Sequence, residues 1–344
     1  MTRLTTFAVC LLLALPAAVA RGQGTPAPDA SAWSDSSPHR VYFISGRAIQ
    51  LQCLDWGGHG PAIVMVHGLG DSPHIFDDLA NRLRQHFRVY AYARRGHGRS
   101  DAPLAPYDDI TLIDDLLQVI DGLRLQRTSL IGWGMGGNEV TAFAGRYPDR
   151  VNKIIYLDGG YDWSTSSFFK AFHKIMSVNT PNPAALRSID SLRVWWHAAW
   201  LGSDAPWTNG LEAYLRDVAH LDMYGHVSPV PTPQVYWAVS TTMGTWRREY
   251  KKVQAPALAL YASTFFPTDR SDPVLAKQLR DFEQNTMVPF RRASIERIQK
   301  ELRNVKVVEM PNRTHMSIGT EDVDSLAAMI GAFVMGAALP APGY

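Results

Sequence analysis

Short apolar runs alternate with longer amphipathic segments along most of the chain from residue 41 onward. Residues 41–45 and 49–56 flank a short turn that contains Gly46, and they predict a β-hairpin. Residues 62–67 are mostly apolar, as is typical of a strand buried on both faces. Further strands are predicted at residues 89–93, 129–133, 151–158, 256–262 and 305–310, and helices at 75–87, 110–125, 135–147, 276–282, 295–303 and 323–335. This succession predicts a parallel, doubly wound sheet with right-handed crossovers.

The regular alternation stops between residues 161 and 252, where the chain is rich in tryptophan and phenylalanine and is interrupted by several prolines. We interpret residues 161–252 as a cap inserted over the carboxyl edge of the sheet, so that residues 39–160 and 253–338 form the core. The aromatic side chains of the cap would cover a small ligand, or they would simply fill the cap's own interior. Residues 21–38 are rich in Gly, Pro, Ala and Ser and predict a flexible leader.

The first 20 residues have the features of an export signal. Arg3 provides a short positive region, residues 7–15 are apolar, and Ala18-Val19-Ala20 is a small-residue cleavage site. The apolar run is shorter than the roughly 20 residues that a membrane-spanning helix needs. The sequence therefore predicts a cleavable signal peptide, a periplasmic or secreted protein and no stable insertion in the membrane. The alternative, an uncleaved N-terminal anchor, is disfavoured by Pro16.

Composition limits the kinds of partner that the chain would bind. With 46% hydrophobic residues among 344 and a formal net charge of +2, the chain is long enough for one large core. Its near-neutral charge gives no reason to expect nucleic acid or acidic lipid as a partner. Cys10 lies in the predicted signal peptide, which leaves Cys53 without a second cysteine for an internal disulfide.

Four short motifs come after the predicted strands and carry most of the functional information. They are H-G-L-G-D at residues 67–71, R-G-H-G-R-S-D at 95–101, G-W-G-M-G at 132–136 and N-R-T-H at 312–315. In this order and spacing they resemble motifs of the α/β-hydrolase fold. The resemblance implies a mostly parallel, doubly wound, eight-stranded sheet with an inserted helical cap. Residues 138–151 and 156–162 also resemble a bacterial group of exported hydrolases.

Gly134 occupies the position at which these hydrolases carry their nucleophilic serine, at the tip of the turn called the nucleophile elbow. The related bacterial group carries G-H-S where this chain has Gly132-Trp133-Gly134. Loss of a triad nucleophile typically costs on the order of 10⁶ in turnover and leaves about 10³ to 10⁴ over water. Gly134 tolerates the strained backbone of the elbow, so we expect the turn to keep its geometry.

The resemblance assigns roles to several other positions. His315 corresponds to the catalytic base, and the backbone N–H groups of Leu69 and Met135 correspond to the oxyanion hole. The acid usually comes after the seventh strand, where this chain has Phe265, with Asp269 several residues further on. Asp158, at the end of the sixth strand, is the preferred acid, although a turn cap would also explain it.

Three other side chains near these motifs have structural interpretations. His67 and His97 lie in turns that the family uses structurally. Glu139 sits one turn into the helix after the elbow, where it is expected to tether a neighbouring loop and not to attack substrate.

Two functions are therefore expected from the sequence. The first is a hydrolase or a related enzyme in which His315 and an acid act without a serine on an ester or another small apolar substrate. The second is a catalytically inactive homologue that binds a small apolar ligand under the cap, or a protein partner. We expect no cofactor and no catalytic metal, because no H-E-x-x-H or spaced Cys/His set occurs. A dinucleotide site at residues 132–137 is not supported, since its ribose-binding acid would have to be Asp158 at a strand end.

Overall fold

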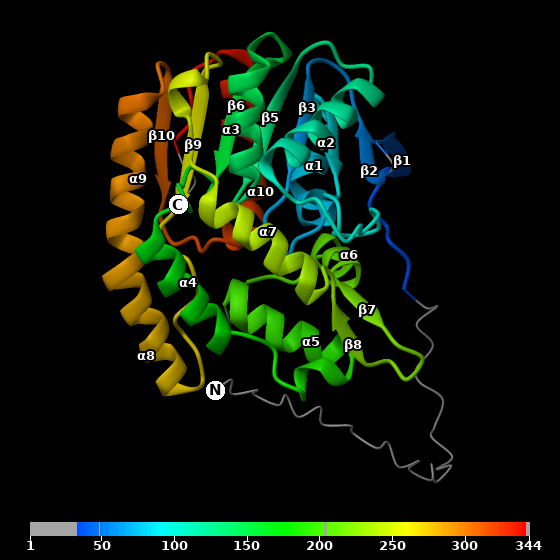
Figure 1. The fold of residues 1–344 in the computed structure, drawn as a ribbon, viewed down its shortest axis with the longest axis vertical. Coiled ribbons are helices and arrows are strands. Elements are labelled where there is room, and N and C mark those ends of the chain that lie inside the picture. The colour runs from blue at the N-terminus through cyan, green and yellow to red at the C-terminus, as the bar shows by residue number, and fades with distance from the viewer. Residues whose placement is uncertain (1–32, 48, 203–204, 342–344) are drawn as a thin grey trace, which may run out of the picture. The chain divides into compact units, whose positions relative to one another are not determined.

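A twisted eight-stranded sheet forms the centre of the computed structural model, which describes residues 33–47, 49–202 and 205–341 (Figure 1). The strands are β1 (Arg40–Gly46), β2 (Ile49–Gly57), β3 (Ala62–Val66), β4 (Arg88–Tyr92), β5 (Thr128–Trp133), β6 (Val151–Leu157), β9 (Ala257–Ala262) and β10 (Val305–Met310). The predicted signal peptide of residues 1–20 and most of the predicted leader at 21–38 lie outside the described residues. Residues from Asp35 onward form one unit.

The order of the strands is β1-β2-β4-β3-β5-β6-β9-β10. β2 pairs antiparallel with both β1 and β4, and all the other neighbours are parallel. The predicted hairpin and the mostly parallel, doubly wound sheet are thus confirmed. In the parallel part, Val66 pairs with Gly132 and Leu157 with Leu260. The carboxyl ends of β3, β5, β6 and β9 therefore meet at one edge of the sheet.

Helices cover both faces of the sheet. On one face lie α2 (Asp109–Gly122), α3 (Gly136–Arg146) and α9 (Val288–Glu301), and on the other lie α1 (Asp77–Leu83) and α10 (Val323–Met335). The N-terminus of α2 is capped by Asp108, whose side chain accepts a hydrogen bond from the N–H of Thr111. The predicted helix at 323–335 coincides with α10. The predicted helix at 75–87 is shorter, because the 3₁₀ turn η2 (Pro73–Phe76) precedes α1.

Two of the predicted helices are confirmed, and both begin earlier in the chain than predicted. The segments at 276–282 and 295–303 belong to a nearly continuous helical stretch made of α8 (Pro273–Phe282), the π-turn η7 (Glu283–Met287) and α9. Glu283 and Arg291 lie within this stretch and form a buried ion pair at 2.9 Å. Because two charged residues occupy the inner face, the apolar periodicity that reveals a helix is interrupted there.

The segment between β6 and β9 lies beyond one end of the sheet (Figure 1). It contains α4 (Ser166–Val178), the 3₁₀ turn η4 (Ala185–Arg187), α5 (Ile189–Trp196), the π-turn η5 (His197–Leu201), α6 (Asn209–Asp217), β7 (Ala219–Leu221), β8 (Val227–Pro229), α7 (Pro233–Thr245) and the 3₁₀ turn η6 (Tyr250–Lys252). The antiparallel β7–β8 ribbon was not predicted, since strands of three residues are too short to show an alternating pattern. Among the described residues, no helix combines the length and apolar character needed to cross a membrane.

Candidate active site

The turn between β5 and α3 has the backbone of a nucleophile elbow. Gly134 has a φ of +52°, in the left-handed region that glycine adopts at little cost. Gly136 permits close contact, because a Cβ atom there would lie 2.1 Å from the carbonyl oxygen of Val66. The glycines thus let the helix begin directly against the end of β3. The turn has the shape expected from the sequence, with no side chain at its tip.

His315 and Asp158 form a buried hydrogen-bonded pair beside this turn. The Nδ1–H of His315 donates to Oδ2 of Asp158 over 2.6 Å. The other carboxylate oxygen, Oδ1, accepts hydrogen bonds from the hydroxyl of Tyr161 at 2.7 Å and from the N–H of Ala262 at 3.1 Å. Asp158 is only 1% exposed and comes directly after β6. Three donors from three segments therefore fix the carboxylate in one orientation.

The imidazole of His315 faces the tip of the elbow. A Cβ atom placed on Gly134 would lie 3.2 Å from both Cε1 and Nε2 of the ring. Phe265 stacks on one face of the imidazole, with ring centroids 4.4 Å apart and planes 10° from parallel. The indole N–H of Trp133 donates to the carbonyl of His315 at 3.1 Å. The ring is thus held in place, with its Nε2 edge directed at the space above Gly134.

The second candidate acid, Asp269, lies elsewhere. Its Oδ1 is 3.7 Å from the position that a Cβ atom on Gly202 would take. Phe265 occupies the place after β9 where the family usually carries its acid, and it contacts His315 through its ring. Of the two carboxylates proposed from the sequence, Asp158 is the one in contact with His315.

The two candidate oxyanion donors lie at the start of the loops after β3 and β5. Within the described part of the chain, the N–H groups of Leu69 and Met135 donate to no protein acceptor. Both residues line the same pocket as His315. Their amides are therefore available to a ligand oxygen.

A buried network holds the loop that contains Leu69. The Nε2 atom of His97 accepts a hydrogen bond from the N–H of Gly70 at 3.3 Å, and its Nδ1–H donates to the carbonyl of Arg95 at 3.0 Å. Burial, assisted by the charge of Arg94, lowers the pKa of His97 to about 3, so this ring is neutral at physiological pH. His67 likewise accepts from the N–H of Arg94 at 3.2 Å. Both histidines hold backbone, in agreement with the structural roles expected for them.

Glu139 belongs to the same network. Its carboxylate pairs with Nε of Arg94 at 2.5 Å and accepts a hydrogen bond from the hydroxyl of Tyr92 at 2.8 Å. Arg94 in turn donates from Nη1 to the carbonyl of Gly68 at 3.2 Å. Glu139 thus tethers the strand-end loops, as the sequence suggested, and it is not among the residues that line the pocket.

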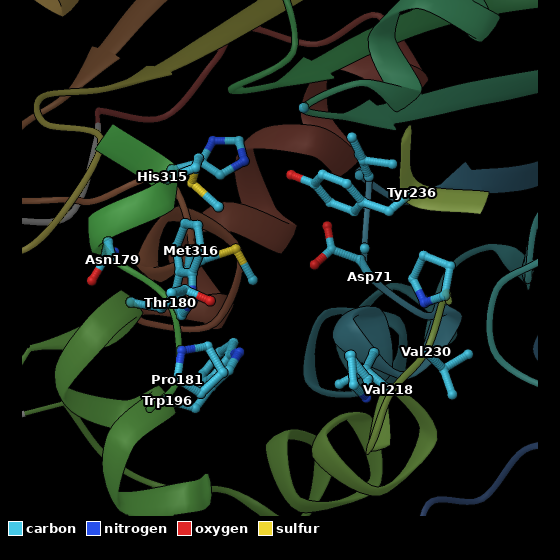
Figure 2. Close-up of a pocket in the computed structure, with 18 of the residues that line it drawn as sticks. Asp71, Asn179, Thr180, Pro181, Trp196, Val218, Val230, Tyr236, His315 and Met316 are labelled. Carbon is cyan, nitrogen blue, oxygen red and sulfur yellow. The ribbon is translucent and has the colours of Figure 1, made fainter. Parts of the chain in front are cut away.

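The elbow and the dyad open into a pocket of about 480 Å³. The volume lies within the range that small-molecule sites occupy. Most of its lining is apolar and comes from the segment between β6 and β9, including residues of α4, α5, α6 and α7. Figure 2 shows Asp71 and Tyr236 on one side of this pocket, directed toward His315 on the other.

Asp71 is a functional candidate that the sequence analysis did not single out. Its carboxyl group is 7% exposed and accepts a hydrogen bond from the hydroxyl of Tyr214 at 2.9 Å. Its Oδ2 atom lies 2.3 Å from the position that a Cβ atom on Gly68 would take. Burial raises the pKa of Asp71, although His315 opposes the shift. Burial and the nearby Asp71 also raise the pKa of Tyr236 to about 12, so its hydroxyl stays protonated.

Comparisons with known proteins agree with this fold. A profile of the alpha/beta hydrolase fold family matches residues 61–226. The chain is 32% identical over 103 residues to an uncharacterized protein of Mycobacterium tuberculosis, which is 30% of each chain. It is also 32% identical over 121 residues to 2-(acetamidomethylene)succinate hydrolase of Mesorhizobium japonicum, covering 34% of this chain and 43% of that protein. The matches therefore span less than half the length of these curated relatives.

Among solved structures, that of E-2-(acetamidomethylene)succinate hydrolase superposes with a TM-score of 0.66 at 19% sequence identity, over 87% of this chain and 100% of that one. A membrane phospholipase A superposes with a TM-score of 0.63 at 20% identity, over 87% of each chain. The sheet order, the elbow and the family match over residues 61–226 together show that the chain has the α/β-hydrolase fold. At this level of identity, the superpositions define the fold alone.

Proposed function

We propose that this protein hydrolyses small, uncharged and largely apolar esters or related carbonyl compounds, with His315 activating a water molecule directly. The observation that carries the proposal is the His315–Asp158 pair, hydrogen-bonded at 2.6 Å and facing the elbow although Gly134 offers no nucleophile. A homologue that had kept only the fold would not need a buried, oriented His–Asp pair directed at the space above Gly134.

In the proposed reaction, Nε2 of His315 takes a proton from water as the water oxygen attacks the carbonyl carbon. The charge that develops on the carbonyl oxygen is stabilised by the N–H groups of Leu69 and Met135. As the tetrahedral intermediate collapses, the bond between the carbonyl carbon and the leaving oxygen breaks, and the imidazolium donates its proton to that oxygen, which gives a carboxylic acid and an alcohol. Asp158 keeps Nδ1 protonated, the tautomer that leaves Nε2 able to accept a proton.

Asp71 contributes a second polar group to this reaction. Because burial raises its pKa, its carboxyl group is more readily protonated than an exposed one. Tyr214 donates to Oδ1, so the proton belongs on Oδ2, which lies on the side of Gly68. A protonated Asp71 would donate a hydrogen bond to the same substrate oxygen as the two backbone amides.

The charge of the pocket indicates the class of substrate. The lining formed by described residues contains no lysine or arginine, and its carboxyl group is Asp71. A substrate with its own carboxylates would therefore meet no cation to pair with. This property favours uncharged compounds over a succinate derivative such as the one named for the relative from Mesorhizobium japonicum.

The test is hydrolysis of short-chain aryl esters by the wild type, His315→Ala and Gly134→Ser. We expect slow wild-type turnover without an acyl adduct in the intact mass, and a loss of about 10² or more in kcat/KM for His315→Ala. His226→Ala, which alters an exposed histidine, is the matched control and should leave kcat/KM unchanged. Wild-type hydrolysis that survives His315→Ala would contradict the proposal.

Gly134→Ser tests the geometry of the same site. The new Cβ atom would lie 3.2 Å from the imidazole, which must shift by a few tenths of an ångström to admit it. If the elbow and the oxyanion donors have the inferred geometry, the serine variant should form an acyl adduct with these esters, whereas Gly134→Ala should not. The absence of an adduct would show that the inferred geometry is wrong.

A second candidate function is the binding of a small apolar molecule without turnover. The combination that favours it is a largely apolar pocket above an elbow that lacks a nucleophile. This function predicts an inert wild type, a Gly134→Ser variant that gains ester hydrolysis, and a small molecule retained in the native mass spectrum of the purified protein. A wild type that loses its turnover in His315→Ala would instead favour catalysis.

A further inference from the structure

Two histidines and two aspartates from separate segments converge away from the pocket described above. Asp35 and His39 lie in the segment before β1, His74 lies in the turn η2, and Asp77 is the first residue of α1. Each offers one nitrogen or oxygen atom, and these four atoms all lie within 4.8 Å of one another. None of the four residues lines the pocket of His315.

The four side chains lie close to one another, and His39 approaches Asp35 through Nε2 and Asp77 through Nδ1. Oδ2 of Asp35 lies 3.4 Å from Nε2 of His39 and 3.7 Å from Nδ1 of His74. Asp77 places Oδ2 3.0 Å from Nδ1 of His74 and Oδ1 3.9 Å from Nδ1 of His39. Two ligands of one tetrahedral zinc ion are separated by roughly 3.3–3.6 Å, given bond lengths of ~2.0–2.2 Å. One ligand atom of each residue lies within 4.8 Å of the others, so a small adjustment of the side chains would bring one atom from each residue to that spacing.

Two buried atoms in the cluster lack a hydrogen-bond partner. Within the described part of the chain, neither Nδ1 of His39 nor Oδ1 of Asp77 makes a hydrogen bond, and these two atoms face each other at 3.9 Å. Their side chains are 4% and 1% exposed. An unpaired buried polar atom is destabilising, so native proteins rarely leave two of them opposite each other. A cation held between them would satisfy both.

The charges of the cluster also suit a cation. Across the residues that the structure describes, Asp35 and Asp77 form ion pairs only with the two histidines and with no lysine or arginine. The cluster therefore holds two carboxylates whose described charge partners are histidines, the residue type that binds transition-metal ions most often.

We propose that Asp35, His39, His74 and Asp77 bind one divalent transition-metal ion, and that Zn²⁺ is the ion the set fits best. Two imidazole nitrogens and two carboxylate oxygens in a partly buried cluster are ligands that Zn²⁺ accepts in four-coordinate structural sites. The site joins the segment before β1 to η2 and α1. It thereby fastens this segment next to the loop that carries Leu69 and Asp71. This role is structural and independent of the proposed reaction, and it adds a metal to a chain whose sequence motifs indicated none.

The experiment measures zinc bound by the full chain, prepared without a histidine tag and dialysed against a zinc buffer at neutral pH. Elemental analysis should give one zinc ion per chain, and Co²⁺ in its place should give the visible spectrum of tetrahedral coordination. The double variant His39→Gln/His74→Gln should lose the metal. Asp35→Asn, which alters an exposed residue, should weaken the affinity at least about tenfold while the fold is retained.

The matched control is His226→Gln, because His226 and Asp222 form an exposed His–Asp pair at 3.2 Å outside the cluster. This variant should keep the zinc ion. Circular dichroism of each variant shows whether it is folded. If the double variant does not fold, the zinc affinity of Asp35→Asn provides the test. Zinc well below one ion per chain, zinc retained at full affinity by folded Asp35→Asn, or zinc lost equally in His226→Gln would overturn the proposal.

Discussion

Gly134 and His315 together determine which steps the proposed reaction can use. The left-handed φ of +52° at Gly134 preserves the elbow, while the absence of a side chain there removes the covalent step of a serine hydrolase. The dyad of His315 and Asp158 does not depend on a side chain at residue 134, because Phe265 and Tyr161 hold it from other segments and Trp133 holds it through its indole N–H. A substitution at the tip can therefore remove the nucleophile and leave the base in position.

Asp71 allows a prediction about the pH dependence of activity. If its protonated carboxyl group binds the substrate oxygen, wild-type activity should fall as the pH rises through the raised pKa of Asp71. Asp71→Asn keeps an acceptor for Tyr214 and an N–H donor beside Gly68. This variant should retain most of the activity and lose the decline at higher pH, whereas Asp71→Leu should lose about 10² in kcat/KM.

Steady-state kinetics with an aryl ester between pH 5 and 9 provides the measurement, with kcat and KM determined at each pH for both variants. A structural role for Asp71 would lower the stability of the variants and leave the shape of the pH profile unchanged. If Asp71→Asn is as inactive as Asp71→Leu, the group acts as a carboxylate and the proposed hydrogen-bond donor is wrong.

At the scale of secondary structure, the positions that the sequence predicted best are those at the carboxyl ends of strands. Leu69, Gly134, Asp158 and His315 each come shortly after a predicted parallel strand, and such strand ends meet at one edge of a sheet. The register of the sheet then brings these positions together. Their proximity could be inferred from the chain because it depends only on the order and direction of the strands.

Contacts that depend on the cap or on irregular segments could not be predicted in this way. Tyr214 is 143 residues away from Asp71 and lies on α6, whose position no strand order determines. The same holds for His39, which precedes the first strand and faces Asp77, the first residue of α1. Neither pair has a spacing in the sequence that a local motif would reveal.

The loop after β3 gives a prediction about stability. The pKa of His97 is about 3 in the folded chain and near 6.5 when unfolded, so its contribution is complete above pH 6.5 and is lost as the pH falls toward 3. His97→Gln disturbs two buried hydrogen bonds and should lower stability at pH 7 by roughly 1–2 kcal/mol. The difference in melting temperature between the wild type and the variant should therefore shrink as the pH is lowered.

Thermal unfolding by circular dichroism at several pH values between 7 and 4 measures this difference. The exposed His86 supplies the control, since His86→Gln should melt with the wild type at every pH. A difference for His97→Gln that is constant across this range would mean that His97 is not a buried neutral group.

At the scale of the whole unit from Asp35 onward, the apolar cores on the two faces of the sheet continue into the segment between β6 and β9, which covers the pocket. The apolar cluster on the α2–α3 face continues into Phe168 and Phe172 of α4. The cluster on the α1–α10 face continues into Leu192 of α5 and Leu211 of α6. The covering segment thus shares both apolar cores with the sheet, and we expect the two parts to unfold together.

Phe168 tests this coupling because it joins α4 to α9. Its ring stacks on Phe290 with centroids 3.8 Å apart, it is 3% exposed, and it does not line the pocket. Phe168→Ala should cost about 3–5 kcal/mol and lower the melting temperature of a single transition seen both by far-ultraviolet circular dichroism and by tryptophan fluorescence. Val194→Ala on α5, whose side chain is 73% exposed, should change it little. Two separate transitions, with the fluorescence change first, would mean that the covering segment unfolds independently and that substrate access is governed by its opening.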